Sequence, residues 1–188
     1  MSRIYKTEGV VLKRKNFGET DRLLTVFTKG NGKLVIVARG IRKIVSRKAP
    51  DLEPFTHLHF VLAIGRIFDY VLEVEVIEKY HFISNNLERI AHAYRLVELV
   101  DRLCPEREPY VEVFALLIET LRNLNSEKQT QLMALSENIA LKLLWELGYL
   151  PREKLMSGIT LTRFLETVME KTLKSQVLLK KLGETERV

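Results

Sequence analysis

Residues 23–38 read LLTVFTKGNGKLVIVA, and this stretch decides the fold of the first part of the chain. Apolar and β-branched residues fill both of its ends, as they do in paired strands. Between them lies Lys29-Gly30-Asn31-Gly32, which contains the residue types that tight hairpin turns prefer. The sequence therefore predicts an antiparallel hairpin with strands at 23–28 and 33–38.

Three further strands are predicted around this hairpin. They lie at residues 7–13, 55–64 and 71–76. The last of them alternates almost strictly, which predicts that Leu72, Val74 and Val76 face inward. Five short strands are too few for an immunoglobulin-type sandwich, and they suit a small closed barrel of the OB or SH3-like kind.

After residue 80 the apolar residues recur with a period of about 3.6 instead of two, which indicates helices. Helices are predicted at about 85–103, 110–124, 127–147 and 161–182. Gly148 and Pro151 are expected to end the third helix, because such residues follow helix C-termini. We therefore expect an α+β protein, with a barrel over residues 1–80 and an α-helical bundle domain over residues 81–188.

Composition excludes several classes of protein. The single cysteine, Cys104, rules out an internal disulfide and a multi-thiolate metal site. No apolar run approaches the roughly 20 residues that span a membrane, and no export signal is visible, so a cytoplasmic location is expected. The chain also lacks a Walker P-loop, GxGxxG and GxSxG, and we expect no catalytic residues, metal or cofactor.

Positive charge is concentrated at the start of the chain. Residues 1–48 contain 13 lysines and arginines against 3 acidic residues, whereas residues 84–188 contain 15 of each. A surface adapted only for solubility would mix both signs along its length. The uneven distribution therefore indicates a polyanionic partner for the first part of the chain.

The strongest candidate site is the basic stretch, which we define as residues 39–48. Five cations lie within these ten residues, in a loop that leaves a predicted strand: Arg39, Arg42, Lys43, Arg47 and Lys48. Such groups bind phosphate oxygens, and the release of condensed counterions drives association without sequence preference. Lys13 and Arg14 would extend the patch if the barrel brings the two segments together. Composition alone leaves an ordinary solvated basic loop equally open.

Aromatic residues matter because single strands bind by stacking their bases on them. Phe27 and Phe60 occupy inward positions of predicted strands and are expected in the core. Phe17 and Tyr70 lie next to predicted turns, so these two are the better candidates for stacking.

Several motifs along the chain form a recognisable set. They are Thr7-Glu8-Gly9-Val10-Val11-Leu12, residues 18–28 from Gly-Glu-Thr-Asp onward, Gly32-Lys33, Ala38-Arg39-Gly40-x-Arg42-Lys43, Leu52-x-Pro54-Phe55 and Leu147-Gly148-Tyr149-x-Pro151. Together they resemble the RecO family of bacterial recombination mediators. The most specific of them is Gly18-Glu19-Thr20-Asp21 between two strands, and the resemblance covers the barrel better than the helices.

The resemblance implies a five-stranded OB-fold barrel followed by a helical domain. It also implies binding of single- and double-stranded DNA, annealing of complementary strands, and help in loading recombinase onto DNA coated by single-strand-binding protein. RecR and single-strand-binding protein are the implied partners. DNA contacts are then expected on Arg39, Arg42, Lys43, Arg47 and Lys48, with Lys13 and Arg14 as secondary candidates.

The sequence departs from this family at one place. Many members carry four cysteines of a zinc site after the Gly-Tyr-x-Pro segment, whereas residues 152–158 contain none here. We expect the zinc module to be absent, which calls into question any partner contact that depends on it. The family also implies a groove between the helices for the tail of single-strand-binding protein, near Lys171 and Lys174.

Two other functions fit the residues themselves. A basic OB face accepts RNA as readily as DNA, so an RNA-binding OB-fold protein is the first alternative. The second is a protein-interaction adaptor whose charge is incidental.

Overall fold

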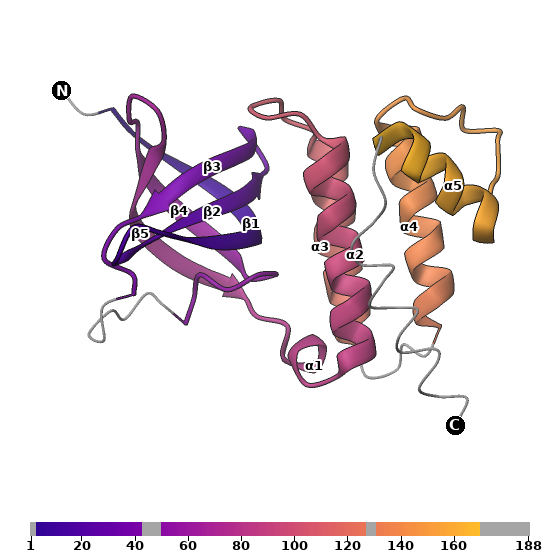
Figure 1. Cartoon of the computed structure of the whole chain (residues 1–188), viewed down its shortest axis with the longest axis horizontal. Coiled ribbons are helices and arrows are strands. Elements are labelled where there is room, and N and C mark those ends of the chain that lie inside the picture. The colour runs from indigo at the N-terminus through magenta and orange to yellow at the C-terminus, as the bar shows by residue number, and fades with distance from the viewer. Residues whose placement is uncertain (1–2, 43–49, 127–130, 170–188) are drawn as a thin grey trace. The chain divides into compact units, whose positions relative to one another are not determined.

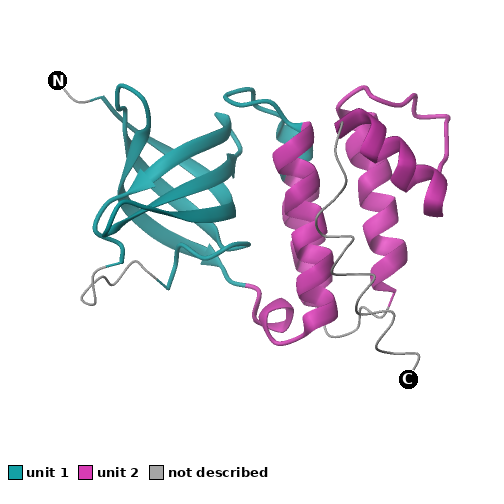
Figure 2. Cartoon of the chain, in the orientation of Figure 1, with its two compact units in different colours: residues 1–79, 104–114 teal, residues 80–103, 115–188 magenta. Residues whose placement is uncertain are grey.

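The computed structural model describes residues 3–42, 50–126 and 131–169. The chain divides into two compact units (Figure 2). The first, which we call the barrel unit, contains residues 1–79 and 104–114, and the second, the helical unit, contains residues 80–103 and 115–188. Residues 104–114, which we expected in the helical domain, thus lie with the strands.

Five strands form a closed barrel in the first unit (Figure 1). They are β1 (Ile4–Phe17), β2 (Asp21–Thr28), β3 (Gly32–Ala38), β4 (His57–Ala63) and β5 (Asp69–Glu78). Their order around the barrel is β1-β2-β3-β5-β4, and only β3 and β5 pair in parallel. This arrangement confirms the predicted five-stranded barrel and has the topology of an OB-fold.

The interior of the barrel is filled by apolar side chains that strands and loop contribute together. The buried members are Val11, Leu24, Val26, Leu34, Ile36, Ala38, Ile41, Leu52, Leu58, Phe60 and Leu62. Each large side chain among them stabilises the folded state by about 1.5–3 kcal/mol when it leaves water. Two of these residues belong to no strand: Ile41 lies within the basic stretch, and Leu52 follows it in the same loop.

The inward face of β5 differs from the prediction. Leu72 and Val76 are exposed, whereas Val71 and Val74 pack against the core. The pairing of β5 with β4 shifts by one residue at Leu72 and again near the end of the strand. Such a bulge moves the following side chains to the other face, so strict alternation in the sequence does not show which residues are inside.

A segment from beyond the strands is fastened to β3. The backbone N–H of Arg107 donates a hydrogen bond to the carbonyl oxygen of Lys33 at 2.9 Å. Next to this bond, Gly32 has a φ of 66°, and a Cβ added there would lie 2.1 Å from the carbonyl oxygen of Glu108. Glycine is therefore required at residue 32, both for its backbone conformation and for the close approach of the segment.

The remaining elements are helices. They are α1 (His81–Ser84), α2 (Leu87–Leu103), α3 (Val111–Asn125), α4 (Leu132–Glu146) and α5 (Gly158–Met169). The four predicted helices correspond to α2–α5, and the predicted extension of the last one beyond residue 169 lies outside the described residues. Within the described part of the chain, no helix has the length and apolarity needed to cross a membrane.

The end of α4 follows the predicted chemistry. Gly148 has a φ of 74°, in the left-handed region that glycine adopts without strain. Its N–H donates to the carbonyl oxygen of Trp145 at 3.1 Å, and the N–H of Tyr149 donates to that of Leu144 at 2.9 Å. This pair of bonds is the Schellman motif, which satisfies carbonyl groups that a helix end leaves without partners.

A buried polar contact joins α2 and α4. The Nδ1 atom of His92 lies 2.5 Å from the hydroxyl oxygen of Ser136, and both side chains are buried. Burial and, to a smaller extent, the positive charge of nearby Arg95 together lower the pKa of His92 to about 4. The imidazole is therefore neutral in the folded protein at neutral pH.

This histidine makes a prediction about stability and pH. Above pH 6.5, His92 is neutral in both the folded protein and the unfolded chain. Below pH 6.5 the unfolded chain binds a proton at this residue, whereas the folded protein does not bind it until about pH 4. The free energy of unfolding should therefore fall by about 2 kcal/mol between pH 7.5 and pH 5 through this residue. Urea unfolding of His92→Gln should show a smaller pH dependence than the unsubstituted protein. His59→Gln, which changes an exposed histidine, is the control, and equal pH dependence in all three proteins would contradict the assignment.

Candidate nucleic-acid interface

The structure describes the beginning of the basic stretch. Arg39 and Arg42 belong to the described residues, and both side chains are exposed. Lys43, Arg47 and Lys48 lie outside the described residues, so their predicted contacts with DNA stay predictions.

The carboxylate of Asp21 holds the beginning of this stretch against the turn between β1 and β2. Its Oδ1 atom accepts hydrogen bonds from the backbone N–H of Gly40 at 2.8 Å and from the hydroxyl group of Thr20 at 2.9 Å. Gly40 has a φ of 63°, a conformation that glycine adopts readily. The last two residues of the Gly-Glu-Thr-Asp motif therefore fix the direction in which the chain leaves β3.

Arg42 completes the same arrangement from the other side. Its backbone N–H donates to the carbonyl oxygen of Thr20 at 2.9 Å. Its guanidinium donates to the carbonyl oxygens of Gly18 at 3.3 Å and Glu19 at 3.0 Å. Part of the donor capacity of Arg42 is thus used to hold the turn, although the side chain remains exposed.

Two core residues anchor the ends of the loop that contains the basic stretch. Ile41 and Leu52 are buried in the barrel core, with exposed fractions of 2% and 0%. Beside the second anchor, the Nζ atom of Lys79 lies 2.7 Å from Oδ1 of Asp51. Burial of these two apolar side chains therefore fixes the points at which the chain leaves and rejoins the barrel. Charged side chains lie around these points.

Arg39 is the predicted cation that the structure positions best for a ligand. Its guanidinium carbon lies 3.9 Å from the centre of the Tyr70 ring, which is a cation–π contact. Such a contact orients the guanidinium and leaves its N–H groups able to bind a phosphate. Tyr70, one of the two predicted stacking residues, thus contacts the first cation of the basic stretch.

The second predicted stacking residue, Phe17, is 46% exposed although it is a large apolar side chain. Its ring meets that of Phe68 edge to face, with centres 6.2 Å apart. This pair joins the β1–β2 turn to the loop between β4 and β5. The sequence favoured Phe17 and Tyr70 over Phe68 for stacking, and only the closed barrel shows that the loop of Phe68 lies beside Phe17.

Lys13 and Arg14 have different surroundings although they are neighbours. Arg14 Nε lies 2.8 Å from Glu53 Oε2, and the other oxygen of Glu53 lies 3.2 Å from Arg22 Nη1. Arg14 pairs in register with Leu24 of the core, whereas Lys13 pairs with Thr25 on the opposite face of the strand. Both side chains are exposed.

The described residues differ in how well they suit a metal site and nucleic-acid binding. Among them, no group of three or more histidine, cysteine, aspartate or glutamate side chains is placed to hold a metal ion. What the face presents is positive charge beside partly exposed aromatic rings, the combination that binds single-stranded nucleic acid.

Comparison with known proteins places both parts of the chain in one family. The family description "Recombination protein O N terminal" matches residues 1–80, and "Recombination protein O C terminal" matches residues 84–154. Among the similar curated proteins, DNA repair protein RecO of a Roseiflexus species is 40% identical over 150 residues, 80% of this chain and 52% of that protein. DNA repair protein RecO of Pelotomaculum thermopropionicum is 37% identical over 149 residues, 79% of this chain and 57% of that protein. The chain thus spans little more than half the length of these relatives.

The role of Asp21 can be tested by its removal. Asp21→Ala leaves the N–H of Gly40 without its acceptor, and we expect the free energy of unfolding to fall by about 1–3 kcal/mol. Urea unfolding followed by circular dichroism measures this change. Glu19→Ala is the matched control, because residue 19 contributes its backbone carbonyl to the turn. If the two variants are equally stable, the carboxylate does not hold the basic stretch.

Proposed function

The chain belongs to the RecO family of DNA repair proteins, and we propose that it is a DNA-binding recombination mediator. On this proposal it binds single- and double-stranded DNA, anneals complementary strands, and assists the loading of recombinase onto DNA coated by single-strand-binding protein. RecR and single-strand-binding protein are its proposed partners. The observation that carries the proposal is the exposed Arg39, oriented by Tyr70 at the start of a basic stretch.

The proposed contacts divide into two kinds. Arg39 and Lys13 would bind phosphate oxygens, together with Arg42 and the cations of the stretch beyond it. Phe17 would stack against a base, since its ring is partly exposed beside the same turn. Phosphate contacts give affinity that depends on salt, whereas stacking depends on it far less and requires an unpaired base.

Annealing follows from the first kind of contact without any covalent chemistry. Two single strands repel each other through their phosphates, and a basic face that binds both reduces this repulsion. Because phosphate contacts carry no sequence information, the bases remain free to find their complements. On this mechanism nucleotide is not consumed.

The two kinds of contact can be separated by the salt dependence of binding. Arg39→Ala should weaken binding of a labelled single-stranded oligonucleotide and reduce the slope of log K against log salt by about 0.7. Phe17→Ala should weaken binding by about fivefold or more while leaving the slope unchanged. Fluorescence anisotropy over a range of salt concentrations measures both quantities. Arg163→Ala, which removes an exposed arginine of the helical unit, should change neither. An unchanged slope in Arg39→Ala would remove this arginine from the interface.

The mediator activity needs its own assay. Two complementary oligonucleotides should anneal faster with the protein than without it, and the gain should persist when the strands are first coated with single-strand-binding protein. The double variant Arg39→Ala, Lys13→Ala should lose most of this acceleration of annealing, because its basic face no longer neutralises the phosphates of both strands. Equal affinity for RNA and DNA, with no acceleration of annealing, would favour an RNA-binding protein. Failure to bind either polymer would favour an interaction adaptor.

A further inference from the structure

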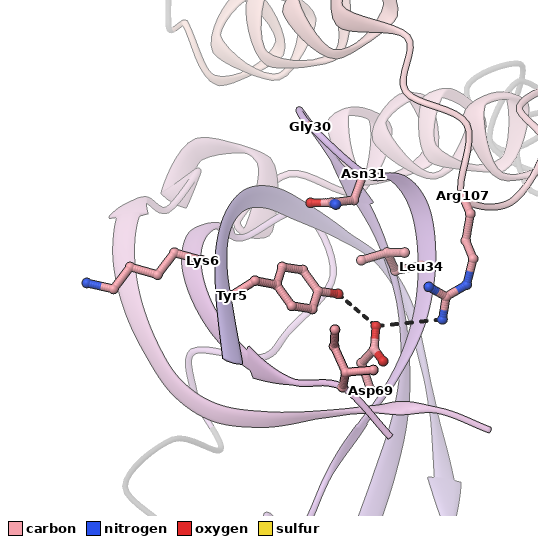
Figure 3. A pocket seen from close by; sticks show the side chains of 8 residues that line it. Tyr5, Lys6, Gly30, Asn31, Leu34, Asp69 and Arg107 are labelled. Atoms are coloured by element: carbon pink, nitrogen blue, oxygen red, sulfur yellow. Dashed lines mark hydrogen bonds and ion pairs between the residues drawn. The ribbon is translucent and has the colours of Figure 1, made fainter. Parts of the chain in front are cut away.

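A cavity of about 450 Å³ lies in the barrel unit, where β1 begins and the β2–β3 hairpin turns (Figure 3). Its lining residues are Tyr5, Lys6, Gly30, Asn31, Leu34, Ile64, Asp69 and Arg107. The volume is in the range of small-molecule sites. None of these residues belongs to the basic stretch or to the aromatic pair beside it, although Asp69 lies between Phe68 and Tyr70 in the sequence.

At the base of the cavity lies a buried carboxylate. Asp69 is 2% exposed, and its Oδ2 atom accepts a hydrogen bond from the hydroxyl group of Tyr5 at 2.7 Å. Its Oδ1 atom accepts from the backbone N–H of Gly65 at 3.3 Å. Burial and the carboxylate both raise the pKa of Tyr5, so the phenol keeps its proton and remains a donor.

Arg107 reaches the same carboxylate from the segment fastened to β3. Its Nη2 atom lies 3.6 Å from Oδ2 of Asp69, and 64% of its side chain is exposed. An ion pair this long and exposed contributes little to stability. It nevertheless orients the guanidinium toward the cavity, as Figure 3 shows, and leaves N–H donors able to bind an anion.

The backbone is built to keep Arg107 in this place. Arg107 has a φ of 59°, a backbone conformation that residues other than glycine and asparagine rarely adopt. Its N–H is bonded to Lys33, and Gly32 provides the space for the following residue. A strained conformation that several contacts maintain is more common at ligand sites than elsewhere.

The remaining walls define the chemistry of a ligand. The amide group of Asn31 lies above the ring of Tyr5 in Figure 3 and adds a further donor to the lining, while the amine of Lys6 points away from the cavity. The ring of Tyr5 with Leu34 and Ile64 forms the apolar part. The cavity thus combines an arginine fork for an anion with an apolar, partly aromatic surface for a flat group, which together match a nucleotide.

We propose that this cavity binds the phosphorylated terminal nucleotide of a DNA strand, with the phosphate on Arg107 and the base or sugar against Tyr5 and the exposed Ile64. A terminal phosphomonoester fits this place better than an internal phosphate, because it carries more charge for the arginine fork and the chain need not pass through the cavity. The proposal rests on the proposed DNA binding and adds to it a preference for strand ends.

The test compares oligonucleotides of one sequence that end in a 5′-phosphate, a 3′-phosphate or hydroxyl groups alone. We expect the protein to bind one phosphorylated form about tenfold more tightly than the hydroxyl form, as measured by fluorescence anisotropy. Arg107→Asn should abolish this preference, so that the phosphorylated and hydroxyl forms bind equally. Asparagine is chosen because it tolerates a positive φ, and an unchanged midpoint of urea unfolding would show that the variant folds. Arg66→Ala removes an exposed cation of the β4–β5 loop outside the cavity and should keep the preference.

The outcomes separate this inference from the proposed function. Equal binding of all three oligonucleotides overturns the preference for strand ends and leaves DNA binding intact. Binding of none of them overturns both proposals. If dAMP alone competes as strongly as the phosphorylated oligonucleotide, the cavity is a site for free nucleotide and the assignment to strand ends is wrong. A preference that survives in Arg107→Asn also overturns it.

Discussion

The hydrogen bond from the N–H of Gly40 to the carboxylate of Asp21 is the constraint on which the candidate interface depends. A backbone donor beside the barrel must have a partner, because leaving one unsatisfied costs about as much as a whole hydrogen bond contributes. Asp21 supplies that partner from the adjacent turn, and Thr20 donates to the same oxygen. The Gly-Glu-Thr-Asp motif therefore has a structural role: it fixes the position from which the basic stretch starts.

Not every cation of a basic segment is equally available to a ligand. Arg14 pairs with Glu53, and Arg42 donates to two backbone carbonyls, whereas Arg39 lies over an aromatic ring. Counting charges along the sequence treats these residues as equivalent. The contacts rank them, because a guanidinium already engaged with carboxylate or carbonyl oxygens must give up those bonds, or share its donors, to bind phosphate. The cation–π contact of Arg39 involves the ring face and leaves its donors accessible.

Local patterns predicted the parts of the fold that local chemistry determines. The hairpin around Lys29-Gly30-Asn31-Gly32 and the helix end at Gly148 follow from turn and cap residues within a few positions of one another. The predicted inward face of β5 was wrong at Leu72. A β-bulge there changes the alternation of the side chains, and the sequence pattern does not show where such a bulge lies. The place of residues 104–114 beside β3 depends on a long-range contact. For the same reason the pairs Phe17–Phe68 and Asp69–Arg107 could not be found from spacing alone.

The two proposed sites of the barrel unit would constrain a bound nucleic-acid strand differently. On the proposed function, charges around the basic stretch would attract any phosphate and allow the strand to slide, since phosphate contacts do not distinguish one nucleotide step from the next. A cavity with one oriented arginine has the opposite character, because it accepts a single group in a single place. If both sites act on one strand, the end of that strand is fixed while the rest stays exchangeable. That arrangement suits annealing, in which bases must remain free to pair although the strand is held.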